Sequence, residues 1–151
     1  MAGIIGNTMG YITAQSMLEH LVENFADNIL EIKEVYRIGD LAREFDVSLR
    51  TLRFYEDRGL ISPKRSGSTR LYSNEDRKRL KIILLTKNVG FSLVDIEHLL
   101  KIYDNESDGE DVGTLVSKFK EQYDRLNDQK DELAHSINAL SKAITFLEEK
   151  S

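Results

Sequence analysis

Apolar side chains recur at alternating steps of four and three residues through the C-terminal part of the chain. The seam comprises Val112, Val116, Phe119, Tyr123, Leu126, Lys130, Leu133, Ile137, Leu140, Ile144 and Leu147. This spacing is a heptad repeat, in which one apolar stripe faces a partner helix. A helix from about 113 to 149, within the segment 113–151, would be about 55 Å long. It would be too long to bury that stripe on a small domain of its own chain. We predict a coiled-coil dimerisation helix, with every seam residue except Val112 and Lys130 as a contact.

Shorter helical patterns precede this seam. Ser16 and Glu19 form a capping box before an apolar repeat, so the extension 1–34 is expected to be partly helical. Further repeats predict helices over 36–45, 48–58, 73–89 and 92–103, and the last two begin with Ser-x-x-Asp signatures. Residues 35–104 should therefore form a small domain, which an acidic, Gly-containing linker over 105–112 joins to the coil.

The helix predicted over 48–58 has signals at both ends. Ser48 can cap its N-terminus, and Gly59 stands where a left-handed residue ends a helix. Leu49, Leu52 and Tyr55 share one side of this helix, whereas Arg50, Arg53, Phe54 and Asp57 share the other. Arginine can hydrogen-bond to guanine with two donors, and an aromatic ring can touch a thymine methyl. The outward face therefore suits the DNA major groove, although a solvated surface helix has the same pattern.

A tight turn at Asp46 joins this helix to the one before it, which is the pattern of a helix-turn-helix. The stretch 61–72 that follows holds the only proline of the chain and a Ser/Gly/Thr centre, and it predicts a two-stranded hairpin. Lys64, Arg65 and Arg70 on this hairpin could contact phosphates. Tyr72 could donate a phenolic hydrogen bond while its ring packs inward. The basic run 77–81 is expected to be a solvated helix face.

Charge is distributed unevenly along the chain. The net charge is −5, yet residues 36–90 hold 13 Lys/Arg against 7 Asp/Glu, so the remainder carries −11. A basic segment in an acidic chain favours a DNA-reading domain on a soluble body. Cysteine is absent, which excludes disulfides and thiolate metal sensing. We expect a cytoplasmic protein, because no signal peptide or membrane-spanning apolar run is evident.

Taken together, these motifs resemble the MerR family of bacterial transcription regulators. The matching residues are 36–42, Val47-Ser48, 51–56, 58–60, 70–73 and 90–93. The resemblance implies a mainly α fold, with a winged helix-turn-helix head, a small β wing and a long antiparallel coiled coil. It implies a homodimer on an inverted-repeat promoter site, which bends and untwists the DNA for RNA polymerase. The DNA contacts that it implies, with the wing residues above, are Ser48, Arg50, Thr51, Arg53, Phe54, Tyr55, Lys64, Arg65, Arg70 and Tyr72.

Two departures from the family pattern concern the wing and the sensing of a signal. The wing centre 66–69 is shorter than the common form, and the sensing cysteines are missing. No cofactor, metal site or effector residue is assigned, and no nucleophile–base pair indicates an enzyme. The alternatives are an architectural DNA-bending protein of the excisionase type, which promoter-dependent transcription would distinguish, and a coiled-coil adaptor, which would show no salt-sensitive binding to DNA.

Overall fold

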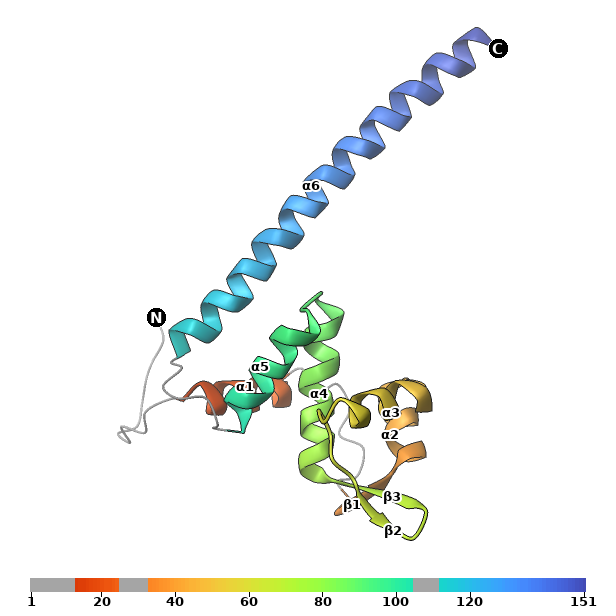
Figure 1. The fold of residues 1–151 in the computed structure, drawn as a ribbon. Helices are drawn as coiled ribbons and strands as arrows, with labels where there is room; N and C mark the ends of the chain where they lie inside the picture. The colour runs from red at the N-terminus through yellow and green to blue at the C-terminus, as the bar shows by residue number, and fades with distance from the viewer. Residues whose placement is uncertain (1–12, 25–32, 105–111) are drawn as a thin grey trace. The chain divides into compact units, whose positions relative to one another are not determined.

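A computed structural model describes residues 13–24, 33–104 and 112–151 (Figure 1). The chain divides into two compact units, one ending at Val112 and one beginning at Gly113. We call the described residues up to 104 the head. Parts of the N-terminal extension predicted to be partly helical, and almost all of the acidic linker, lie outside the described residues. None of the described helices is long and apolar enough to cross a membrane.

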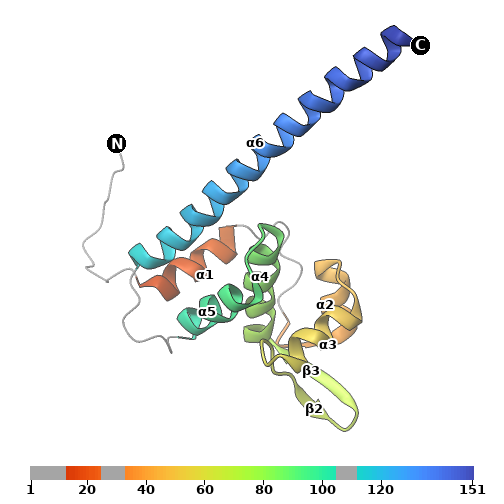
Figure 2. The same cartoon turned by 45° about the horizontal axis from the view of Figure 1, so that its top comes forward.

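The head combines five helices of the described chain with a small antiparallel sheet (Figure 2). In chain order these elements are α1 (Ala14–Asn24), β1 (Val35–Arg37), α2 (Ile38–Phe45), α3 (Leu49–Asp57), β2 (Lys64–Ser66), β3 (Thr69–Ser73), α4 (Asn74–Asn88) and α5 (Leu93–Tyr103). Strand β3 lies between β1 and β2 in the sheet. The core includes Leu41, Leu52, Ile61, Leu80, Ile83, Ile96 and Leu99, which are all nearly inaccessible to solvent.

Helix boundaries follow the side-chain caps that the sequence predicts in most places. The hydroxyls of Ser48, Ser73 and Ser92 each accept a hydrogen bond from the backbone N–H three residues later. Asp46 adopts the left-handed conformation with φ 51°, and Gly59 does so with φ 72°. The helix-turn-helix turn and the end of α3 are therefore as predicted from these residue types.

Two boundaries predicted from the sequence are wrong. Helix α1 is capped by Thr13, whose Oγ1 accepts a hydrogen bond from the Ser16 N–H at 3.1 Å, so it begins before Ser16. The helix expected from residue 36 begins only at Ile38, because Tyr36 belongs to β1 and lies opposite Tyr72 of β3. The predicted two-stranded hairpin is thus part of a three-stranded sheet. The sequence near β1 gave no sign of its pairing with β3, because 35 residues separate Tyr36 from Tyr72.

Helix α1 packs against α5 and α4 (Figures 1 and 2). Its buried side chains are Ala14, Leu18 and Val22, which recur every four residues on one face. This helix from the N-terminal extension is therefore a constituent of the head's hydrophobic core.

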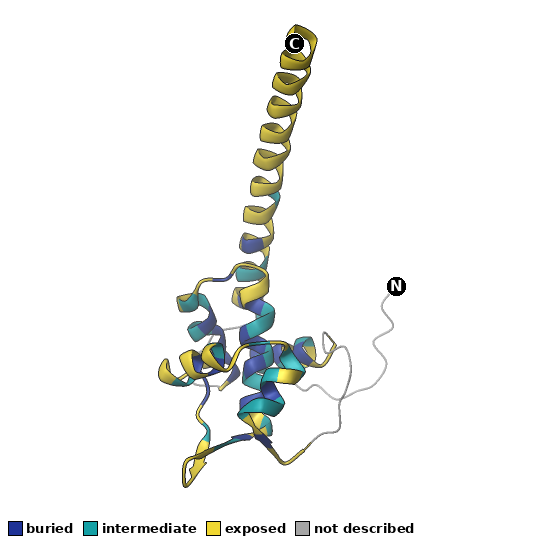
Figure 3. Cartoon of the chain, turned by 90° about the vertical axis from the view of Figure 1, so that its right-hand side faces the viewer, coloured by how far each residue is buried: buried dark blue, intermediate teal, exposed yellow. Residues whose placement is uncertain are grey.

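Helix α6 (Val112–Lys150) is one continuous helix of 39 residues, roughly 58 Å at the standard rise. Within this chain most of its seam is exposed to solvent (Figure 3). The apolar seam side chains from Val116 to Leu147, apart from the half-buried Phe119, are between 38% and 67% exposed. The long C-terminal helix is therefore as predicted, and its apolar seam, interrupted at Lys130, is largely exposed within this chain.

Candidate nucleic-acid interface

The N-terminus of α3 is held by two residues predicted to contact DNA. Ser48 Oγ accepts a hydrogen bond from the Thr51 backbone N–H at 3.1 Å, and the two hydroxyl oxygens lie 2.9 Å apart. Both side chains sit at the end of the helix where backbone N–H groups lack helical partners. This end of α3 therefore offers hydroxyls and a positive dipole to an anion.

The outward face of α3 is open, as its pattern predicts. Arg50 and Arg53 are exposed, and neither forms an ion pair with another residue of the described chain. Phe54 is 44% exposed, and the Arg58 guanidinium lies 5.2 Å from its ring centroid. Leu49, predicted to face inward, is instead 41% exposed, because it stands in the first turn beyond the edge of the core. Two unpaired arginines thus flank an exposed aromatic ring.

Two tyrosines predicted to contact DNA lie inside the head. Tyr55 is 2% exposed and Tyr72 is fully buried, and burial raises the pKa of Tyr72. The Tyr72 ring packs inward as predicted, and its hydroxyl makes no hydrogen bond within the described chain. Both rings therefore pack in the core of the head, and the direct contacts to DNA that the sequence predicts for them stay predictions.

Glu56 of α3 binds both arginines of the wing. Its carboxylate accepts hydrogen bonds from Arg70 Nε at 2.6 Å and from Arg65 Nη2 at 3.2 Å. The hydrogen bond from Arg70 to Glu56 raises the pKa of Arg70, whereas Lys64 is exposed and has no such partner in the described chain. Sequence reasoning missed Glu56, because its partners lie nine and fourteen residues away. Hydrogen bonds from Arg65 and Arg70 therefore join the wing to α3.

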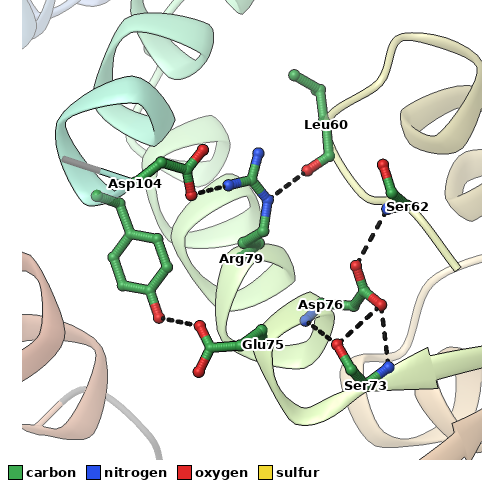
Figure 4. Close-up of polar contacts among 8 residues, drawn as sticks. Leu60, Ser62, Ser73, Glu75, Asp76, Arg79 and Asp104 are labelled. Carbon is green, nitrogen blue, oxygen red and sulfur yellow. Dashed lines mark hydrogen bonds and ion pairs between the residues drawn. The ribbon is translucent and has the colours of Figure 1, made fainter. Parts of the chain in front are cut away.

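Helix α4 supports the segment that follows α3. Arg79 Nε donates to the Leu60 carbonyl at 2.8 Å, and the same guanidinium pairs with Asp104 at the end of α5 (Figure 4). Asp76 accepts hydrogen bonds from the backbone N–H of Ser62 at 3.0 Å and of Ser73 at 2.9 Å. The chain leaving α3 and the strand entering α4 are thus fixed to one helix.

The basic run on α4 is not the solvated face that was expected. Arg77 is 6% exposed, and its guanidinium donates to the Glu44 carboxylate of α2 through Nε and Nη2. Arg79 is engaged as described above, and burial lowers the pKa of Lys81. Hydrogen bonding and charge pairing within the head therefore account for Arg77 and Arg79, which a charge count cannot distinguish from surface residues.

Comparisons with known proteins agree with this geometry. A family profile described as MerR HTH family regulatory protein matches residues 36–102, and one described as MerR, DNA binding matches residues 77–143. The HTH-type transcriptional regulator YfmP of Bacillus subtilis (strain 168) is 32% identical over 114 residues, which are 74% of this chain and 81% of that protein. The chain belongs to the MerR family. It is a DNA-binding transcription regulator, as predicted, and neither alternative is favoured.

Solved MerR-family structures share the fold. A transcriptional regulator from Bacillus cereus matches with a TM-score of 0.62 at 23% identity, covering 72% of this chain and 78% of that one. HiNmlR, described as a MerR family regulator lacking the sensor domain and bound to promoter DNA, matches with a TM-score of 0.54 at 26% identity, covering 69% and 79%. Neither family profile reaches α1, so this helix is an addition to the matched part of the MerR-family head.

Proposed function

We propose that two copies of the chain pair through α6. The seam is apolar at every position after Val112 except Lys130, and it is largely exposed along about 50 Å of helix. A stripe of this length is unfavourable in water, and a heptad seam is covered most simply by another copy of itself. The contacts would be the nine apolar seam residues from Val116 to Leu147. Their regular spacing supports this assembly.

The observation that carries DNA reading is the open face of α3. Arg50, Arg53 and Phe54 project from a helix whose opposite side is anchored by Leu52 and Tyr55 in the core. A helix presented in this way fits the major groove, where arginine can bind the O6 and N7 atoms of guanine. Ser48 and Thr51 would meet phosphate at the helix N-terminus, and Lys64, Arg65 and Arg70 would hold the backbone beside the groove.

A dimer with two such heads would read an inverted repeat, because its two-fold symmetry repeats each half-site contact. DNA between the half-sites would be bent and untwisted at a cost that depends on its own sequence. RNA polymerase would then engage a promoter whose elements this distortion realigns. This finer mechanism rests on the resemblance to regulators of the family, one of which is described as bound to promoter DNA.

Footprinting tests the proposal directly. Purified protein is titrated onto the DNA upstream of its own gene and neighbouring genes, at two salt concentrations. A protected inverted repeat between promoter elements is the expected result. Salt-sensitive smearing without a protected site would favour an architectural protein, and absence of all binding would favour an adaptor.

The role of Arg53 has a sharper test on the footprinted site. Arg53→Ala should weaken specific binding by about 1–3 kcal/mol and change affinity for random DNA much less. Lys142→Ala removes the same charge from an exposed position of α6 and is the control. Equal losses for operator and random DNA in Arg53→Ala would contradict base reading by this residue.

A further inference from the structure

An open cavity of about 530 Å³ lies where the first turn of α2, the outward face of α3 and the tip of the wing meet. Four arginines line it, namely Arg37 at the end of β1, Arg43 in the last turn of α2, Arg53 from α3, and Arg70 from β3. Two of them, Arg37 and Arg43, have no place in the DNA-contact set predicted from the sequence. Four guanidinium groups around one cavity repel one another unless an anion shares the space.

Two of the four arginines are oriented by carboxylates of the head. Arg43 Nη2 lies 2.8 Å from Asp40 Oδ1, and Arg70 Nε lies 2.6 Å from Glu56 Oε2. The other two, Arg37 and Arg53, form no ion pair within the described chain. After both carboxylates are counted, the group keeps a net charge of +2. The carboxylates therefore position arginines without neutralising the cavity.

The backbone of α2 adds to the same field. The Arg37 N–H is taken by Asp40 Oδ2 at 2.9 Å, which holds the start of the helix in place. This hydrogen bond lowers the pKa of Asp40, so the carboxylate stays ionised and keeps its hold on Arg43. Gly39 lines the cavity in the first turn, and a Cβ there would lie 3.6 Å from Arg43 Nη1. The guanidinium of Arg43 therefore folds back over the positive end of the helix dipole.

We propose that this cavity is the seat of one DNA backbone phosphate, bound by Arg37 and Arg43. Arg53 and Arg70 line the same cavity and add to its positive charge, while Arg53 reaches the bases in the groove. The proposal rests on the DNA-reading function argued above and extends the contact surface from α3 and the wing to α2. DNA is the anion that fits best, because the cavity is open and borders the elements that present Arg53 and the wing. A phosphate held there would fix the depth and angle at which α3 enters the groove.

The experiment measures the salt dependence of binding to a random-sequence duplex and to the footprinted inverted repeat, using full-length protein. Neutralising one phosphate contributes about 0.9 to the slope of log affinity against log salt. If Arg37 and Arg43 share one phosphate per head, the double variant Arg37→Ala/Arg43→Ala should reduce the slope by about one for each head bound. Each single variant should already show most of that change, on both duplexes.

Controls separate the seat from general effects of charge and folding. Lys101→Ala removes one positive charge from an exposed position of α5 and should leave the slope unchanged. Arg43→Gln keeps a donor beside Asp40 while removing the charge, and it should reproduce the slope of Arg43→Ala if that variant folds poorly. Thermal melting of each variant verifies that the head is intact.

The possible outcomes discriminate clearly. If the slope of log affinity against log salt is unchanged in the double variant, the proposal is wrong. If that slope falls by about two for each head, Arg37 and Arg43 bind two separate phosphates, and the proposal is also wrong. Inorganic phosphate is added to the free protein as a further probe. If it raises the melting temperature of the wild type but not of the double variant, while the duplex slopes are equal, the site binds free anions and the proposal fails. Failure of the wild type to protect any operator would instead contradict the proposed function.

Discussion

Removing Glu44 should destabilise the head severely, because it would leave the buried guanidinium of Arg77 without its carboxylate partner. Arg77 is 6% exposed, and its Nε lies 2.8 Å and 3.0 Å from the two carboxylate oxygens of Glu44. Its guanidinium also lies 5.6 Å from the ring centroid of Tyr36. The hydrogen bonds that Arg77 donates to Glu44 raise the pKa of Arg77. Arginine stays protonated in proteins even without such a partner, so Arg77 cannot escape the penalty by losing its proton once Glu44 is removed. The pair joins α2 to α4 behind the helix-turn-helix.

The magnitude follows from the difference between breaking and replacing a buried pair. Removing one partner typically costs about 3–5 kcal/mol, whereas replacing both by apolar residues of similar volume is often neutral or stabilising. A domain of this size has a total stability of roughly 5–15 kcal/mol. Glu44→Met alone should therefore remove a large share of the head's stability, and Glu44→Met/Arg77→Met should recover most of it.

Urea unfolding followed by circular dichroism measures these differences, at one fixed protein concentration because association contributes to stability. Glu44→Met should lower the urea midpoint by more than about 1 M. The control is Lys78→Ala on the same helix, whose pair with Glu75 is exposed at 39% and 64%. An exposed pair of this kind contributes about 0–1 kcal/mol.

The double-variant cycle provides the refutation. If Glu44→Met costs no more than Lys78→Ala, then the desolvation argument is wrong. If the double variant loses as much as the two single variants added together, the two side chains are not energetically coupled.

Two further predictions concern dimerisation through the coil and the stability of the head at alkaline pH. Lys130→Leu completes the apolar seam and should strengthen dimers by about 1–3 kcal/mol per protomer. Sedimentation equilibrium measures this change, and Lys142→Leu, which lies off the seam, is the control. An equal gain in dimer stability for Lys142→Leu would contradict the assignment of the seam. Burial and then the hydrogen bond to Glu75 raise the pKa of Tyr103. The native head thus keeps a proton that the unfolded chain loses above about pH 10, so stability should fall as pH rises beyond that point. Urea midpoints measured between about pH 8 and 11 should therefore decrease less steeply with pH in Tyr103→Phe than in the wild type. An equally steep decrease in both would show that Tyr103 does not cause it.

Local signals predicted the helices and their ends. The hydroxyls of Ser48, Ser73 and Ser92 cap within three residues, and the left-handed conformations of Asp46 and Gly59 are ones that these two residue types tolerate. These interactions and conformations depend on one short stretch of sequence, and for Gly59 on the absence of a Cβ, so a pattern of residue types suffices to predict them.

Long-range partners were beyond such patterns. Strand β1 is short and exists because Tyr36 pairs with Tyr72, and its sequence was assigned to a helix. Burial separates Tyr55 and Tyr72 from the exposed members of the predicted DNA-contact set, although all of them lie in the same motifs. A residue type shows which contacts are possible, whereas the packing of distant segments selects among them.

The sequence by itself determined the helix-turn-helix, the exposed arginine face of α3, the long heptad helix and the family, because each depends on spacing along a regular element. Only the tertiary structure decided which groups the arginine side chains contact. Arg77 and Arg79 are bound within the head, Arg65 and Arg70 are held by Glu56, and Arg37, Arg43 and Arg53 line one cavity together with Arg70. Charge acts through space over several ångströms, and neighbours in space are set by folding rather than by order along the chain.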